Sequence, residues 1–507
     1  MSDKIQFKSA LISVYHKEGL EEVAKALHGL GVEIWSTGGT WDFLNALGCR
    51  PRKVEDLTGY PSILGGRVKT LHPKVFGGIL HRQDLMEDLN ELAAYEIPAI
   101  DLIVVDLYPF EQTLLRGGTP DEMIEKIDIG GISLIRAAAK NHRRCTVVSK
   151  ATQYPRLLEQ IQTQGGTSLE QRAVYAAEGF AVSSHYDRCI FDYLNRDLQV
   201  AGLRLSSDDE TPLRYGENPH QSARFYGPLH DVFQLLSGKP LSYNNLLDVD
   251  AACSLLAEFN EPTFVVIKHN NACGLASRDN LLQAWTDALA GDPVSAFGGI
   301  LAANSPVDLD CATAIDRIFY EVLVAPEFSP EAIDLLTRKK NRILLQQRMP
   351  LPAGPQVRAA LGGFLVQSPD HLTENPADFK VVTRKKPTNQ ELEDMAFAVK
   401  VVKHTRSNAI VLVKNKQLIG SGTGQSSRID AMRQAALKAR TFDFPLQGAV
   451  MASDAFFPFA DSVEVAFQEG IRAVIQPGGS VKDQDSIDFC DRNDMAMVVT
   501  GIRHFKH

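Results

Sequence analysis

The 507-residue sequence lacks the features that mark several large classes of protein. Its seven cysteines are an odd number, lie far apart and form no CxxC pair, so neither a disulfide framework nor a thiolate zinc site is indicated. The most apolar stretch, AIDLIVVDLYPF, is too short to span a membrane and contains Asp101 and Asp106. The start, MSDKIQFKSA, has no apolar signal-peptide core. We therefore expect a cytoplasmic protein that does not bind membranes.

An excess of positive charge is also missing. Lys and Arg total 53 against 62 Asp and Glu, which gives a net charge of −9 without long blocks of one sign. A nucleic-acid partner is therefore disfavoured. The hydrophobic content of 44% is enough for large cores, and a chain of this length predicts about three domains of roughly 100 to 200 residues.

The order of apolar and amphipathic segments predicts an α/β protein. Residues 1–200 alternate short apolar strands with helical patterns, which is typical of a parallel sheet covered by helices. The polar stretch RLSSDDETP, residues 204–212, marks a domain boundary. The alternation recurs within 201–507, over about 213–370 and 371–507, and predicts two further α/β lobes. No internal repeat in the sequence is strong enough to prove a duplication.

A strand, a turn and a helix follow one another in VEIW-STGGT-WDFLNAL. This order places Ser36, Thr37 and Gly38 at a helix N-terminus, where backbone amides favour an anion. The alternative is that the glycines only let the chain turn, while Thr37 or Thr40 caps the helix.

Cationic side chains gather in the next loop, LGGRVKTLHPK. Arg67, Lys69, His72 and Lys74 suit a phosphate group. A solvated basic loop is the alternative.

The segment IDIGGISLIRAAAKNH places an acid before a helix that carries cations. Asp128 precedes the glycine turn, and Arg136 and Lys140 lie four residues apart on one helix face. Tyr108 ends the LIVVDLY strand. Ligands of open α/β sheets bind at the carboxyl ends of strands, so these loops together predict one site.

The stretch TFVVIKHNNACG joins a core strand to reactive side chains. Residues 264–267 are apolar and predict a buried strand, which continues into Lys268, His269, Asn270 and Asn271. A cation beside an imidazole favours the neutral, proton-accepting form of the ring, so Lys268 and His269 are a candidate acid–base pair. A hydrogen-bonded core histidine beside a buried lysine is the alternative.

Further loops offer binding groups. LRYGENPHQ contains Arg214 and Tyr215 in a polar loop or interdomain turn, and SDAFFPFAD contains Phe456 and Phe459, which suit a flat aromatic ligand or simply fill a core. IGSGTGQSSRID is glycine-rich but lacks the lysine of a P-loop, which excludes a nucleotide triphosphatase.

These motifs, in this order, closely resemble the bifunctional AICAR transformylase/IMP cyclohydrolase family from about residue 8 to the last residue. The matching segments include STGGT, GGRVKTLHPK, LRYGENPHQ, LSYNNLLDVDAA, KHNNACG, DPVSAFGGI, GTGQSSR, SDAFFPFAD and RHFKH. The resemblance implies a methylglyoxal-synthase-like N-terminal domain and two cytidine-deaminase-like lobes, the latter in fold only, because the zinc signature of deaminases is missing.

The resemblance also implies two consecutive reactions in purine biosynthesis. The region 201–507 would transfer a formyl group from 10-formyltetrahydrofolate to AICAR, and the domain 1–200 would close the product FAICAR to IMP with loss of water. Small molecules would be its ligands, with no tightly bound cofactor, no metal, and a homodimer with transformylase sites built across the interface.

The family resemblance assigns roles in formyl transfer. His269 would accept the proton of the AICAR amine by way of the substrate carboxamide. Lys268 would assist protonation of the leaving group or stabilise the developing oxyanion. The other expected positions are Asn408 and Asp461 for orientation, Arg214, Tyr215 and Arg503 for AICAR, and Phe456 and Phe459 for the pterin.

The roles implied for ring closure lie in the first domain. The phosphate would be held by Lys17, Thr37, Arg67 and Thr70, beside the Ser36–Gly38 turn, and the reacting groups would be surrounded by Lys69, Tyr108, Asp128 and Lys140. Tyr108 would protonate the oxygen, and Asp128, paired with Lys140, would receive the carboxamide proton.

The sequence departs from the family pattern at several positions. Tyr15 and His16 replace an expected Ser-Asp beside the phosphate-binding lysine, Ala272 replaces a proline, His404 a tyrosine and Ala460 an arginine. Two alternatives follow: a transformylase that has lost its cyclohydrolase, or a non-catalytic sensor of purine intermediates. A sensor could discard Lys268, His269, Lys69 and Asp128, and all four are present.

Overall fold

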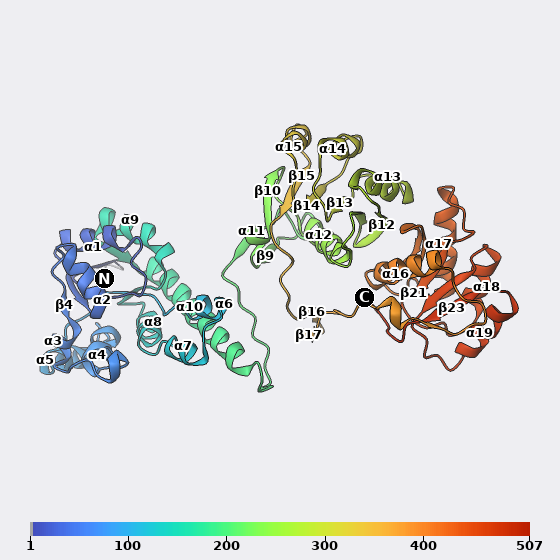
Figure 1. Cartoon of the computed structure of the whole chain (residues 1–507). Coiled ribbons are helices and arrows are strands. Elements are labelled where there is room, and N and C mark those ends of the chain that lie inside the picture. The colour runs from blue at the N-terminus through green and yellow to red at the C-terminus, as the bar shows by residue number, and fades with distance from the viewer. Residues whose placement is uncertain (1–3) are drawn as a thin grey trace. The chain divides into compact units, whose positions relative to one another are not determined.

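The computed structural model describes residues 4–507, so the first three residues of the polar N-terminal stretch lie outside the described part. The chain divides after Ser207 into two compact units, unit 1 up to Ser207 and unit 2 from Asp208 (Figure 1). Among the described residues, no helix combines the length and apolar content that crossing a membrane requires.

A parallel sheet forms the centre of unit 1. Its strand order is β4-β3-β2-β5-β6, and every neighbouring pair is parallel, as the alternating pattern predicts. The strands are β2 (Ser9–Ser13), β3 (Glu33–Ser36), β4 (Arg52–Lys53), β5 (Leu102–Val105) and β6 (Thr146–Val148). All residues of β5 and β6 are buried, because a parallel sheet covered on both faces has no solvent side.

Helices follow each of these strands in unit 1. They are α1 (Leu20–Gly29), α2 (Gly38–Ala46), α3 (Val54–Thr58), α4 (Pro73–Leu80), α5 (Met86–Ala94), α6 (Phe110–Leu115), α7 (Pro120–Glu125), α8 (Gly130–Lys140), α9 (Tyr154–Gln164) and α10 (Leu169–Asn195). The long helix α10 packs on α8, α6 and β6. The short strands β1 (Lys4–Gln6) and β7 (Gly166–Ser168) pair with each other.

Unit 2 is built on a 12-stranded sheet. Its order is β10-β15-β14-β13-β11-β12-β20-β19-β21-β22-β23-β18. The strands are β10 (Phe233–Ser237), β11 (Thr263–Lys268), β12 (Asn271–Ser277), β13 (Ile300–Ala303), β14 (Val322–Ala325), β15 (Ile343–Gln347), β18 (Lys380–Val381), β19 (Ile410–Lys414), β20 (Gln417–Gly422), β21 (Val450–Ser453), β22 (Ala473–Gln476) and β23 (Ala496–Val499).

The two halves of this sheet repeat one arrangement of elements. Each half runs helix, hairpin, helix, strand, helix, strand, helix, strand, and both hairpins shift register by a bulge. The helices are α12 (Tyr243–Leu256), α13 (Leu281–Gly291), α14 (Leu309–Ile315) and α15 (Pro330–Leu336), then α16 (Asn389–Lys403), α17 (Arg428–Thr441), α18 (Asp461–Gln468) and α19 (Asp483–Arg492). The structure thus contains a repeat that the sequence is too diverged to display.

The strand directions bring several motifs to one edge of the sheet. β11 ends at Lys268, and the antiparallel β13 begins beside it at Ile300. β20 ends at Gly422, opposite Ile410 at the start of β19, and Ile410 in turn faces Ser453 at the end of β21. Since β12 and β20 are antiparallel neighbours, these strand ends lie along the same central edge.

Small antiparallel pairs complete unit 2. They are β8 (Glu210–Pro212) with β9 (Arg224–Tyr226), and β16 (Gln356–Ala360) with β17 (Gly363–Gln367). The short helix α11 (Leu229–Val232) precedes β10. Every residue of β17 is exposed.

Candidate active sites

The glycine turns of unit 1 meet around Lys69. A Cβ atom on Gly38 would lie 3.6 Å from the Lys69 Nζ, and one on Gly66 would lie 2.9 Å from it. Gly66 also has φ 91°, a conformation that favours glycine. The two loops that the sequence analysis singled out therefore share one lysine, which reaches the N-terminus of α2.

The threonines of the STGGT turn do not cap α2. Thr37 occupies the N-cap position without a side-chain capping bond, and its Oγ1 lies 3.0 Å from the Ser13 Oγ. Thr40 instead binds the Val14 backbone and accepts a 3.1 Å bond from Lys17 Nζ. The capping alternative is thus wrong, and the amides at the start of α2 remain suited to an anion.

Lys17 and Ser36 both lie near the start of α2. The Lys17 ammonium also donates to the Val14 carbonyl, and burial lowers the pKa of Lys17 although the nearby Asp106 opposes this shift. Ser36 is fully buried and donates to the Ile12 carbonyl at 2.7 Å. Its hydroxyl therefore supports the strand rather than facing a ligand.

Asp128 and Tyr108 lie together at the start of α8. The Asp128 carboxylate is buried, accepts a 2.6 Å bond from the Gly131 amide, and also accepts the Tyr108 amide. Burial raises the pKa of Asp128, and burial followed by the Asp128 charge raises that of Tyr108. Thr70 Oγ1 would lie 3.2 Å from a Cβ on Gly130. One acid, one phenol and the basic loop thus converge.

Tyr15 and two side chains that the sequence did not indicate, Lys126 and Tyr186, lie around Tyr108 and Asp128. The Tyr15 ring meets the Tyr108 ring edge-on at 5.7 Å, and Lys126 Nζ lies 5.0 Å from the Tyr15 ring centroid. The Tyr186 hydroxyl accepts the Asp128 amide at 2.9 Å. Tyr186 is 58 residues from Asp128 in sequence, so only the packing of α10 on α8 could reveal it.

His16, which departs from the family pattern, is held in place by Asp106. His16 Nδ1 lies 2.8 Å from the Asp106 Oδ2, and the amides of Tyr15 and His16 donate to the same carboxylate. Asp106 therefore holds this loop beside Tyr108.

Lys140 and Arg67 are two further expected members of the site. Lys140 is the last residue of the 11-residue helix α8, which at 1.5 Å per residue puts it about 15 Å beyond the helix start near Asp128. The expected Asp128–Lys140 pair stays a prediction. Arg67 pairs with Glu125, and both side chains are exposed.

In unit 2, β11 delivers Lys268 and His269 to the central edge. Residues 263–267 are buried, which confirms the predicted strand. Lys268 Nζ donates to the Phe297 carbonyl at 2.7 Å, and Gly298, with φ 66°, leaves room for it. His269 is exposed and Lys268 only half-buried, so the alternative of a core histidine beside a buried lysine is wrong.

A carboxylate fixes the backbone of His269. Both His269 and Asn270 have positive φ, 51° and 63°, and the Asp248 carboxylate accepts both amides, that of Asn270 at 2.6 Å. Burial raises the pKa of Asp248, while the amides and His269 oppose the shift. Asn271 accepts the Arg406 amide at 3.3 Å, which joins the first hairpin to the second half of unit 2.

A cavity of about 270 Å³ opens beside this turn. Lys268 and His269 line it together with residues of β12, β20, α13 and α17. Asp292 and Lys438, from opposite halves of unit 2, form an ion pair in its wall. Burial raises the pKa of Asp292, but the pairing outweighs it and the net shift is downward. β12 and β20, which contribute to its lining, are neighbours in the sheet and pair at Ala276 and Gln417.

Helix α12 links the expected AICAR-binding residues to the histidine. Arg214 Nη2 donates to the Asn245 Oδ1 at 3.1 Å, and the Arg214 guanidinium lies 5.2 Å from the Tyr215 ring centroid. Asn245 and Asp248 are three residues apart and share one helix face, so Arg214 and His269 lie near the same face of α12.

The remaining expected residues flank strands of the same edge. Asn408 exchanges backbone bonds of 3.2 Å with Gln425, and Phe456 and Phe459 are 37% and 54% exposed in the loop after β21. Exposure contradicts the core-filling alternative for these rings. The Asp461 carboxylate accepts the Ser462 amide at the start of α18.

Arg503 lies near an arginine that the sequence analysis missed. Arg503 and Arg428 stand 4.5 and 5.6 Å from the Phe505 ring centroid. Arg428 pairs at 3.2 Å with Asp454, which is 1% exposed and directly follows β21. The motif GTGQSSR contains Arg428, so the signal was present in the sequence.

Each of the two α/β units carries a cluster of cationic and proton-carrying side chains at strand ends, an arrangement typical of an enzyme. A model of the family described as the AICARFT/IMPCHase bienzyme matches residues 138–438, and a model of the MGS-like domain matches residues 19–133.

Curated relatives match the whole chain. The protein named "Bifunctional purine biosynthesis protein PurH" of Bacteroides thetaiotaomicron is 56% identical and is covered, like this chain, over 100% of its length. Proteins of the same name are 44% identical in Persephonella marina, over 99% of this chain and 100% of the relative, and 47% in Chloroflexus aurantiacus, over 98% of each. A solved structure titled "Crystal structure of ForH" is 34% identical over 37% of this chain and 99% of its own, with a TM-score of 0.33.

The chain belongs to the AICARFT/IMPCHase bienzyme family. It is a bifunctional enzyme of purine biosynthesis, with AICAR transformylase and IMP cyclohydrolase activities and an MGS-like N-terminal domain. The predicted family, the two activities and the overall fold class are thereby confirmed. The alternatives of a sensor and of a lost cyclohydrolase are not favoured.

Proposed function

We propose that the two reactions use separate sites, formyl transfer at the central edge of unit 2 and ring closure at the loops of unit 1. The observation that carries this division is the convergence at one sheet edge of Lys268, His269, Asn408 and the loop after β21. Unit 1 has its own acid and phenol, Asp128 and Tyr108, in contact through a backbone bond.

In formyl transfer, His269 accepts the proton of the AICAR amine by way of the substrate carboxamide. The turn held by Asp248 presents its ring to solvent, where substrate can reach it. Lys268 stabilises the developing oxyanion or protonates the departing nitrogen. The formyl donor is 10-formyltetrahydrofolate, a cosubstrate rather than a bound cofactor.

Positioning of the two substrates falls to the surrounding loops. Arg214, Tyr215 and Arg503 bind AICAR through cationic and phenolic groups. Phe456 and Phe459 stack on the pterin, a role that their exposure supports. The remaining expected residues, Asn408 and Asp461, orient the amine and the formyl donor.

In ring closure, the loops around Lys69 hold the nucleotide. Lys17, Thr37 and Thr70 bind its phosphate together with the amides at the start of α2, and Arg67 joins them after leaving Glu125. The carboxamide nitrogen attacks the formyl carbon, Asp128 receives the carboxamide proton, and Tyr108 protonates the oxygen that leaves as water. The raised pKa of Asp128 brings a carboxylate closer to the strength that a general base needs.

We also propose a homodimer with transformylase sites built across its interface. The hairpin β16–β17 supports it, because Leu361, Phe364 and Leu365 are 107%, 61% and 64% exposed on an edge without other strands. Such apolar side chains mark interaction surfaces. In sedimentation experiments the wild-type protein should be a dimer, and Phe364→Asp should weaken the association of the two subunits.

The domain limits and the cellular compartment are further proposals. The division after Ser207 supports a cyclohydrolase domain of about 1–200, and the repeated helix–hairpin order supports two cytidine-deaminase-like lobes of about 213–370 and 371–507. Seven unpaired cysteines support a reducing, cytoplasmic location.

The test mixes purified protein with AICAR and 10-formyltetrahydrofolate, follows folate absorbance, and resolves FAICAR from IMP by chromatography. Tetrahydrofolate together with IMP is the expected result. Tetrahydrofolate with accumulating FAICAR would show that the Tyr15–His16 departure has disabled unit 1. Absence of folate turnover would contradict the proposed transformylase site.

A further inference from the structure

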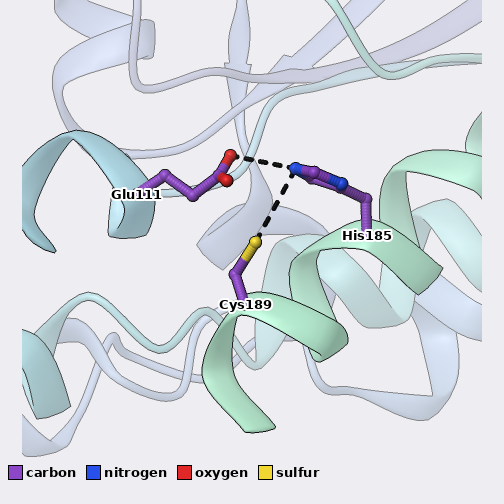
Figure 2. A group of neighbouring side chains, drawn as sticks. All are labelled: Glu111, His185 and Cys189. Atoms are coloured by element: carbon purple, nitrogen blue, oxygen red, sulfur yellow. Dashed lines mark hydrogen bonds and ion pairs between the residues drawn. The ribbon is translucent and has the colours of Figure 1, made fainter. Parts of the chain in front are cut away.

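Three potential metal ligands converge in unit 1 outside both proposed sites. His185 and Cys189 lie one turn apart on α10, and Glu111 reaches them from α6; their ligand atoms all lie within 4.8 Å of one another. Figure 2 shows the three side chains pointing toward a common centre. Neither proposed reaction uses any of them.

The distances fit a tetrahedral zinc ion. His185 Nε2 lies 3.0 Å from the Glu111 Oε2 and 3.7 Å from the Cys189 Sγ. With zinc bonds of about 2.0 Å to nitrogen or oxygen and about 2.3 Å to sulfur, tetrahedral angles place neighbouring ligand atoms about 3.3 and 3.6 Å apart. Glu111 and Cys189, the third pair, have ligand atoms within 4.8 Å of each other, so side-chain movements would complete three corners.

The second nitrogen of the histidine is already held. His185 Nδ1 lies 3.0 Å from the Ser206 Oγ. A metal-bound histidine commonly donates its other N–H to an acceptor, which fixes the orientation of the ring. The Ser206 hydroxyl can both donate and accept, so it can form a hydrogen bond with Nδ1 whether or not a metal is bound to Nε2.

One neighbouring cation opposes metal binding. Arg188 Nη2 lies 3.3 Å from the Cys189 Sγ and 3.9 Å from Glu111. Its other amino group is already paired with Asp192 at 2.9 Å, so the guanidinium can retain that partner when it withdraws. Carboxylate, imidazole and thiolate together suit zinc better than magnesium or calcium, which prefer oxygen ligands.

We propose that Glu111, His185 and Cys189 bind one zinc ion, with water in the fourth position. Glu111 has a side chain that is 50% exposed, whereas Cys189 is 5% exposed, so the open position faces solvent on the Glu111 side. The thiol proton leaves to solvent as the thiolate binds. Because α6 begins two residues after Tyr108, the ion ties the segment after the proposed general acid to α10.

The test uses the full chain, purified without a polyhistidine tag and freed of metal by a chelator. Co²⁺ is titrated as a spectroscopic probe, and Zn²⁺ affinity is measured by competition with a chromogenic chelator. The expected result is one Co²⁺ per chain with a thiolate charge-transfer band and the visible bands of a tetrahedral ion, all displaced by one Zn²⁺.

Variants locate the ion. Cys189→Ser should abolish the charge-transfer band, and Glu111→Gln, at an exposed position, should weaken Zn²⁺ binding at least about 10-fold. Ser206→Ala should weaken it about 10-fold by freeing the histidine ring. Cys49→Ser, a buried cysteine elsewhere in unit 1, is the matched control and should leave the band intact.

Two results would overturn the proposal. One is a wild-type titration without a charge-transfer band or stoichiometric uptake. The other is a band and affinity that remain unchanged in both Cys189→Ser and Glu111→Gln, since the ion would then lie elsewhere.

Discussion

The two proposed sites treat their proton carriers in opposite ways. Unit 1 buries Asp128 to 8% exposure beneath backbone amides, whereas unit 2 presents His269 to solvent on a turn of positive φ. In unit 1 the protein itself shifts the pKa of the acid and of the phenol. In unit 2 the protein fixes only the backbone of His269, and the imidazole ring stays open to the substrate.

This difference follows from the chemistry that each site must perform. Ring closure joins two groups of one bound molecule, so a prearranged acid and base are sufficient. Formyl transfer joins two separate molecules, so its site must stay open until both have bound. The pH dependence of ring closure should therefore reflect the protein, and formyl transfer should depend more on how loops are positioned.

The largest effect on ring closure is expected from Asp128→Asn. The amide cannot accept the carboxamide proton, so the cyclisation rate of added FAICAR should fall about 1000-fold. In wild type the rate should rise with pH as Asp128 ionises, and because its pKa is raised, this rise should occur above the range of an ordinary aspartate. Rate–pH profiles measure both effects. A variant that keeps the wild-type profile would exclude Asp128 as the base.

A smaller loss is expected from Tyr108→Phe. Removing the hydroxyl leaves water to protonate the departing oxygen, which should slow cyclisation about 100-fold. Burial and the Asp128 charge raise the pKa of Tyr108, so the phenol stays protonated and can donate. Tyr15→Phe, on the ring that packs against Tyr108, is the control and should cyclise FAICAR nearly normally. Equal losses in both variants would point to packing instead of proton transfer.

In unit 2, Asp248→Ala tests whether positioning dominates. The substitution leaves the amides of His269 and Asn270 without their acceptor, which should destabilise the turn by about 1–3 kcal/mol. Formyl transfer should fall about 10-fold by a lower kcat, with ring closure of added FAICAR unchanged. Asp248→Asn, which retains one acceptor oxygen, should recover part of the loss. Full transformylase activity in the alanine variant would contradict the positioning role.

The smallest effect concerns stability in the C-terminal segment beside Arg503. His504 is buried; burial lowers its pKa, but bonds to Glu374 and Asp370 outweigh this and the net pKa is raised above 6.5. A histidine with a raised folded pKa stabilises the protein fully below its unfolded pKa, and this stabilisation is lost as the pH rises through the folded pKa.

The thermal midpoint of unit 2 should therefore decline as the pH rises above 6.5. Each kcal/mol lost corresponds to roughly 1–2 °C for a body of the size of unit 2, residues 208–507. Calorimetry of wild type and His504→Gln at several pH values measures the shift. Identical pH dependence in the two proteins would assign the decline to another group.

Local patterns in the sequence predict much of this molecule. The buried strand at 263–267 and the parallel sheet of unit 1 follow from apolar runs separated by helical periodicity. Glycine-rich turns identify the loops around Lys69, because Gly38 and Gly66 have the positive φ angles that favour glycine. These signals lie within about ten residues of the groups they predict.

Contacts between distant segments are not predictable in this way. Tyr186 reaches Asp128 only because α10 packs on α8, and Asp248 reaches His269 only through α12. The expected Asp128–Lys140 pair stays a prediction, because a helix separates the two residues along its axis. The exposure of His269 also depends on the sheet edge, which the sequence of the strand alone does not specify.

The central claim, that two independent sites perform the two reactions, is tested most directly by comparing His269→Ala with Asp128→Asn. Each full-length variant receives AICAR with 10-formyltetrahydrofolate, and separately FAICAR. We predict that His269→Ala releases no tetrahydrofolate yet closes FAICAR to IMP at the wild-type rate, while Asp128→Asn releases tetrahydrofolate and accumulates FAICAR. Loss of both reactions in either folded variant, or formyl transfer at the wild-type rate without His269, would contradict the account.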